Sequence, residues 1–135
     1  MKKIKSLIVG SGTIGAYLSK LLIKKNHNIV VTSRFRKKKY KNYEKLKISK
    51  KIKFKKLNIL NKKEIKKIIL SEKPDNIFYF AGQSSIPKSY ELPKETFQSN
   101  FTGAKNFLEI MLKNKIYTNF FKANSGYIFK PVKGK

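Results

Sequence analysis

A glycine-rich turn constrains the fold of this chain more than any other feature of its sequence. Residues 10–15 read Gly-Ser-Gly-Thr-Ile-Gly, so the glycines follow the spacing G-x-G-x-x-G. A short apolar run, residues 4–9, precedes the turn, and apolar residues at helical spacing follow it between residues 13 and 25. An apolar strand that leads directly into a helix is typical of a parallel sheet covered by helices. The turn therefore predicts a strand–helix–strand unit at the start of the chain.

Each glycine of this turn has an expected physical role. Gly10 would allow the tight bend, Gly12 would let a diphosphate approach the backbone, and Gly15 would let the helix pack closely on the strand. The free amides at the start of the helix, together with the helix dipole, would face the phosphates of a dinucleotide. The expected contacts are Gly10, Ser11, Gly12, Thr13, Ile14 and Gly15. The alternative is a glycine turn that binds no ligand.

Strands and helices alternate along the rest of the chain. Strands are expected at residues 29–32, 52–57, 76–81 and 120–121, and helices at residues 64–70 and 94–113. Two loops are expected, at 34–51 (with one helical turn near 43–46) and at 82–93. The longest helix should bury Phe97, Phe101, Ala104, Leu108, Met111 and Leu112. The pattern predicts an α/β fold in one domain, 1–135, with a doubly wound parallel sheet of strand order 3-2-1-4-5.

The end of the second strand bears on the choice of cofactor. NAD-binding proteins of this type carry an acidic residue there, about 20 positions after the glycines, to bind the ribose 2′-hydroxyl. This chain reads Thr-Ser-Arg-Phe-Arg over residues 32–36 and has no carboxylate. Ser33, Arg34 and Arg36 could instead bind a 2′-phosphate, which favours NADP over NAD. The alternative is that both arginines merely belong to a basic loop.

The net charge of +26 raises the question of a polyanionic partner, since the chain has 33 Lys and Arg against seven Asp and Glu. The lysines are spread along the whole sequence, and Arg34 and Arg36 are the only arginines. Specific base recognition and phosphate clamping favour arginine. The composition therefore predicts solvated lysines and no specific nucleic-acid partner. Charge-driven polyanion binding remains an alternative.

Other classes of site are excluded by residue counts. The chain has no cysteine and a single histidine, His27, which rules out disulfides, thiolate metal sites and histidine clusters. No apolar run approaches the length needed to span a membrane. The first apolar run is too short for a signal peptide, so a cytoplasmic location is expected.

Taken in order, these motifs resemble the extended short-chain dehydrogenases/reductases (the NAD-dependent epimerase/dehydratase family), and most of all the GDP-mannose 4,6-dehydratases. The resemblance covers nearly the whole chain. It rests on the glycine turn with Ala16-Tyr17-Leu18 and the arginines after the second strand, and on four further segments, residues 73–77, 80–85, 100–106 and 121–125.

The resemblance implies a Rossmann-type sheet and assigns further residues. Asn58 and Ile59 would contact the adenine, and Ala81 and Gly82 would lie near the nicotinamide ribose. Gln83 would touch the cofactor at the mouth of the substrate cleft. The remaining residues would serve a nucleotide sugar such as GDP-mannose: Ser84 and Ser85 in binding, and Ser125 as the catalytic hydroxyl. The alternative for the three serines is ordinary loop capping.

Four features depart from the family's pattern. The glycine turn is one residue shorter than T-G-x-x-G-x-x-G, and Asn58 stands in place of an aspartate. Tyr127 stands where a dehydratase has its proton-transferring glutamate, and the family places its Tyr-x-x-x-Lys pair beyond residue 135. Because hydride transfer needs a positioned acid/base, the chain alone is expected to be inactive. We thus expect an incomplete domain that ends after the fifth strand and lacks a substrate domain.

The leading hypothesis is the NADP-binding part of a nucleotide-sugar 4,6-dehydratase. In the complete enzyme, NADP would oxidise the hexose at C4 and return the hydride at C6 after loss of water. The alternatives are another epimerase or reductase of the same family, or a non-catalytic, regulatory NAD(P)-binding protein. A homo-oligomer is compatible with each of them.

Overall fold

The computed structural model describes residues 2–35 and 40–124. Its sheet contains five strands, which are β1 (Lys5–Val9), β2 (Asn28–Ser33), β3 (Ile52–Lys56), β4 (Asn76–Tyr79) and β5 (Asn119–Lys122). All strands are parallel and lie in the order β3-β2-β1-β4-β5. This is the predicted doubly wound, Rossmann-type order, which changes direction between β1 and β4.

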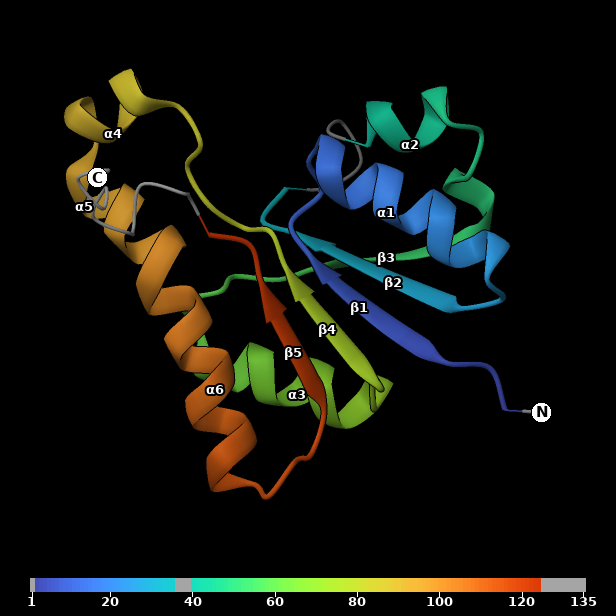
Figure 1. Cartoon of the computed structure of the whole chain (residues 1–135). Coiled ribbons are helices and arrows are strands. Elements are labelled where there is room, and N and C mark those ends of the chain that lie inside the picture. Colours follow the sequence, from blue (N-terminus) through green and yellow to red (C-terminus); the bar gives the residue numbers. More distant parts are fainter. Residues whose placement is uncertain (1, 36–39, 125–135) are drawn as a thin grey trace, which may run out of the picture.

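Helices cover both faces of the sheet (Figure 1). The helices on one face are α1 (Thr13–Lys24) and α2 (Lys41–Lys45), and those on the other are α3 (Lys62–Glu72) and α6 (Gly103–Lys113). Register explains this division, because alternate residues of a strand face opposite sides. Leu7, Val30 and Ile77 are paired across three strands and join the core under α3 and α6. The next residues, Ile8 and Val31, join the core under α1 and α2.

The two predicted loops contain short helices. The basic segment after β2 forms α2 and the 3₁₀ turn η1 (Ser49–Lys51), and the segment after β4 contains α4 (Ile86–Glu91). The prediction of a loop over 82–93 is therefore wrong for α4. Ser85 accepts a hydrogen bond from the Lys88 amide at 3.5 Å, and a proline lies in the first turn. These capping features start a helix that has no apolar periodicity to reveal it.

The long helix predicted over 94–113 is present, but its buried face was predicted wrongly. It consists of α5 (Pro93–Phe97), the π-helical segment η2 (Gln98–Thr102) and α6. Of the six side chains expected inside, only Ala104 and Met111 are buried; the exposed ones are Phe97, Phe101, Leu108 and Leu112. Phe107 and Ile110 occupy the core instead. Leu108 and Leu112 lie in the regular helix α6, beside the buried face that contains Phe107 and Ile110. The apolar arc of α6 is therefore wider than the part that faces the sheet, and the predicted face was centred on the wrong side of this arc.

The Tyr79 side chain explains where the π-helical segment lies. Its hydroxyl group donates to the Ser99 carbonyl oxygen at 2.7 Å. A Cβ atom on Gly103 would lie 2.2 Å from the same hydroxyl oxygen, so only glycine leaves room for it. Burial raises the pKa of Tyr79, which keeps the hydroxyl protonated as a donor. The core of β4 is thus connected directly to the irregular part of the long helix.

Candidate functional site

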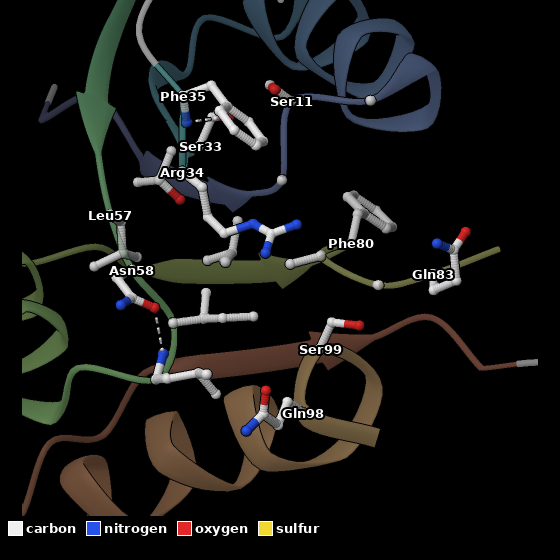
Figure 2. A pocket seen from close by; sticks show the side chains of 18 of the residues that line it. Ser11, Ser33, Arg34, Phe35, Leu57, Asn58, Phe80, Gln83, Gln98 and Ser99 are labelled. Atoms are coloured by element: carbon white, nitrogen blue, oxygen red, sulfur yellow. Dashed lines mark hydrogen bonds between the residues drawn. The ribbon is translucent and has the colours of Figure 1, made fainter. Parts of the chain in front are cut away.

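A cavity of about 690 Å³ lies at the carboxyl ends of the strands, where the order of the sheet changes direction. Open α/β sheets bind ligands at this position. The cavity volume is in the range of small-molecule and cofactor sites. Figure 2 shows side chains converging on it from the ends of β1, β2, β3 and β4 and from the long helix.

The three glycines of the turn differ in what surrounds them. Gly10 has φ of 108°, and a Cβ there would lie 2.8 Å from the Ala81 nitrogen. At Gly15 a Cβ would lie 2.9 Å from the Gly10 carbonyl oxygen, because α1 packs tightly on β1. Gly12 is different: it has φ of −73°, and a Cβ there would meet nothing within 4 Å. Gly10 and Gly15 are needed by the fold, whereas the space over Gly12 is left open.

The start of α1 presents free backbone donors beside that open space. Gly12 is the N-cap, it has no side-chain cap, and the first helical bond runs from the Ala16 amide to the Gly12 carbonyl oxygen. The amides of the first turn therefore have no acceptor within the helix. Ser11 lines the cavity, but Thr13 and Ile14, which were also predicted to contact the cofactor, do not. The Thr13 hydroxyl accepts a bond from Asn42 at 3.3 Å.

The end of β2 supplies a cation. Ser33 and Arg34 both line the cavity, and Figure 2 shows the Arg34 side chain extending over it. The Arg34 guanidinium lies 5.5 Å from the centre of the Phe35 ring, and the Ser33 hydroxyl accepts a bond from the Phe35 amide. Arg36 lies outside the described residues. Lys41, at the start of α2, adds a second cation to the cavity wall.

Side chains form hydrogen bonds to the backbone of the loop after β3. Asn58 and Ile59 line the cavity as expected. The Asn58 amide donates to Glu64 at 2.9 Å, and the Asn58 side-chain oxygen accepts from the Leu60 amide at 3.0 Å. The Ile59 carbonyl oxygen accepts from the side chain of Asn106 at 3.1 Å. The loop is thus fixed before any ligand arrives.

The loop after β4 forms the opposite wall. Ala81, Gly82 and Gln83 line the cavity. Ser84 and Ser85 do not line it, and Ser85 caps α4. Ser125 and Tyr127 lie outside the described residues, so the proposed catalytic hydroxyl has no structural description here.

Sequence reasoning missed several residues of the wall. They come from the ends of the strands, from α2 and from the long helix: Val9, Thr32, Phe35, Lys41, Asn42, Leu57, Leu60, Phe80, Glu95, Gln98 and Ser99. Lys41 and Asn42 lie in the basic segment that was expected to be a loop with one helical turn near 43–46, and the first turn of α2 begins before that range. Glu95 lies in α5 and Gln98 and Ser99 lie in η2, and these polar residues are not part of the apolar pattern from which the helix was predicted.

Two further structural findings concern residues 2–35 and 40–124. Within them, no group of three or more His, Cys, Asp or Glu side chains could hold a metal ion. None of the helices over these same residues has the length and apolar character required to cross a membrane.

Comparison with known proteins identifies the family. The sequence model of the GDP-mannose 4,6 dehydratase family matches residues 7–129. The chain belongs to the NAD-dependent epimerase/dehydratase family of extended short-chain dehydrogenases/reductases.

Curated relatives within this family have different activities. A UDP-N-acetyl-alpha-D-glucosaminuronate decarboxylase from Bacillus cytotoxicus is 30% identical over 115 residues, which cover 85% of this chain and 35% of the relative. A UDP-glucose 4-epimerase from Pisum sativum is 25% identical over 136 residues, which cover 96% of this chain and 39% of the relative. The chain thus spans between about a third and two fifths of the length of these relatives.

A solved structure of the family has the same fold. The UDP-glucose 4-epimerase from Brucella ovis, crystallised in complex with NAD, superposes with a TM-score of 0.77 at 20% identity. The match covers 91% of this chain and 36% of the epimerase chain. The predicted fold class is confirmed.

Proposed function

We propose that the cavity binds a nicotinamide dinucleotide. Its diphosphate would lie against the backbone from Ser11 to Thr13, and its adenosine between Arg34 and Asn58. Its nicotinamide half would lie along Ala81, Gly82 and Gln83. The observation that carries the proposal is the contrast among the glycines: Gly10 and Gly15 are required by the fold, but Gly12 faces open space beside free helix amides.

The cations on the wall favour NADP as the dinucleotide. Arg34 and Lys41 line the cavity, and Ser33 adds a hydroxyl group beside them. A guanidinium and an ammonium would stabilise a 2′-phosphate by charge-assisted hydrogen bonds. The structural relative from Brucella ovis was crystallised with NAD, so NAD is the competing cofactor.

The whole enzyme to which this cofactor site belongs would act on a nucleotide sugar. The family match favours a 4,6-dehydratase acting on a substrate like GDP-mannose. The pea relative, which aligns with 96% of this chain, supports a 4-epimerase as the second candidate. In both cases the bound dinucleotide would accept a hydride from the sugar. This chain would hold the cofactor in place, and Ser84, Ser85 and Ser125 would serve the sugar.

Calorimetric titration of the 135-residue chain with NADPH and NADH tests the proposal. At about 150 mM KCl, where exposed charges are screened, we expect saturable binding with one site per chain. The Gly12→Val variant should lose at least about ten-fold in affinity, since its side chain would fill the diphosphate position. Its stability should fall by no more than about 1 kcal/mol, because valine is a poorer N-cap than glycine. Absence of saturable binding, or equal binding by Gly12→Val, would overturn the proposal.

A further inference from the structure

The helical run from Pro93 to Lys113 contacts both loops that wall the cavity. It passes without interruption from α5 through η2 into α6. The hydroxyl of Tyr79 on β4 holds the Ser99 carbonyl oxygen. A Cβ on Gly103 would lie 2.7 Å from the Cδ1 atom of Ile59, so the helix also touches the loop after β3. The run therefore has a fixed position relative to the cavity.

Asn106 connects this helix to the loop after β3. The residue is 5% exposed, and its side-chain NH₂ group donates to the Ile59 carbonyl oxygen at 3.1 Å. An asparagine buried beneath an apolar sheet is costly unless it is hydrogen-bonded. A leucine would fill the same place without that cost, so packing alone does not explain the amide. What the amide adds is a fixed position for a backbone that lines the cavity.

Asn100 makes the corresponding contact to the loop after β4. Its side-chain oxygen accepts from the Gln83 amide at 2.8 Å, and its NH₂ group donates to the Gln83 carbonyl oxygen at 3.2 Å. A Cβ on Gly82 would lie 2.4 Å from the same side-chain oxygen. Asn100 lies within the π-helical segment. The two-way hydrogen bond fixes both the position and the orientation of the Gln83 peptide groups.

We propose that Asn106 and Asn100 are positioning residues that act on opposite halves of the bound dinucleotide. Asn106 sets the backbone of the adenosine wall through Ile59, and Asn100 sets the backbone of the nicotinamide wall through Gln83. The inference rests on the proposed function, because it assigns the two walls to the two halves of a dinucleotide. It predicts that substitution of Asn106 weakens every ligand that contains adenosine, whereas substitution of Asn100 weakens only the ligands that contain nicotinamide.

The test is a titration of several variants with NADH, NADPH and ADP. ADP contains the adenosine and the diphosphate but no nicotinamide. Asn106→Leu should weaken all three ligands by about ten-fold, and Asn100→Ala should weaken both dinucleotides by about ten-fold while leaving ADP unchanged. The chain has no tryptophan, so the fluorescence of the reduced nicotinamide can be followed without interference from it.

Three controls separate positioning from a general loss of structure. Asn114→Ala removes another helix asparagine, which donates to the Ile110 carbonyl oxygen away from the cavity. Ile110→Val loosens the core on the same helix and lowers stability at a residue that does not itself line the cavity. Both should bind all three ligands as the wild type does. The affinity that remains in Gly12→Val measures the charge-driven binding that does not depend on the glycine turn. Asn106→Ser replaces Asn106→Leu if the latter does not fold.

The outcomes distinguish the inference from the proposed function. Failure of the wild type to bind any of the ligands contradicts both. Wild-type binding that Asn106→Leu or Asn106→Ser leaves unchanged would overturn the inference alone. So would an equal loss of ADP and dinucleotide affinity in Asn100→Ala, because a merely structural role would not distinguish the two halves.

Discussion

The cavity and the end of α3 use charge in opposite ways. Where α3 ends, Glu72 is 3% exposed and is surrounded by the ammonium groups of Lys5, Lys53 and Lys55. The Lys53 nitrogen lies 2.8 Å and the Lys5 nitrogen 3.6 Å from its oxygens. At the cavity, Arg34 and Lys41 form no ion pair within residues 2–35 and 40–124.

This difference separates residues that stabilise the fold from residues that remain available to a ligand. Burial by itself raises the pKa of Glu72. Hydrogen bonds from Lys53 and Lys55, together with their positive charges, outweigh this effect and lower the pKa to about 2. The carboxylate is therefore ionised at neutral pH and neutralised within the protein. Among residues 2–35 and 40–124, the cations of the cavity have no ion-pair partner, which leaves them available to the anionic ligand proposed above.

Gly10→Val should cause the largest loss of stability, about 3 kcal/mol, although Gly10 lines the cavity. A valine there would need the left-handed φ of 108° and would clash with Ala81. Urea unfolding followed by circular dichroism measures the loss. A Gly10→Val variant as stable as Gly12→Val would show that the turn does not need the close approach to β4.

Glu72→Gln should lower the free energy of unfolding by about 2 kcal/mol, because it weakens charge-assisted hydrogen bonds to a buried group. The affinity for NADPH should stay at the wild-type value, since Glu72 lies outside the cavity. Chemical denaturation and calorimetry on the same sample measure both quantities. A large drop in affinity would mean that the two regions are not independent.

Acidification should remove part of the same stabilisation. The pKa of Glu72 is lower in the folded protein than its ordinary value of 4.5, so its contribution is complete above pH 4.5 and is lost as the pH falls toward 2. The wild type should therefore lose more stability than Glu72→Gln between these values. Parallel stability curves for the two proteins would contradict the role given to the lysine cluster.

Arg34→Gln should have the smallest effect, confined to the choice of cofactor. Removal of the guanidinium should lower the affinity for NADPH by about ten-fold relative to NADH. Lys2→Gln, which removes a cation at the start of the chain, serves as the charge-matched control. An unchanged ratio of the two affinities would leave NAD and NADP equally supported.

The sequence predicted the parts of the molecule that follow a regular period. The apolar strands and the glycine turn between β1 and α1 indicated the sheet order, and the cavity lies where that order implies. The buried face of the long helix was predicted wrongly because the apolar arc of α6 is wider than the face that packs on the sheet. In the sequence, Asn100 and Asn106 stood out only as members of the family segment at residues 100–106. Their contacts could not be predicted, because a hydrogen bond to a distant backbone group leaves no periodic signal. Lys41 was hidden for a similar reason, since α2 is too short to show a pattern.

Nuclear magnetic resonance of the ¹⁵N-labelled chain during titration with NADPH tests the central claim most directly. If the cavity binds the dinucleotide as proposed, the amides of Ser11, Gly12, Thr13 and Gly82 should show saturable shifts. These shifts should persist as the salt concentration is raised to about 300 mM. Shifts confined to surface lysines, or shifts that disappear with salt while these four amides stay unmoved, would contradict the account.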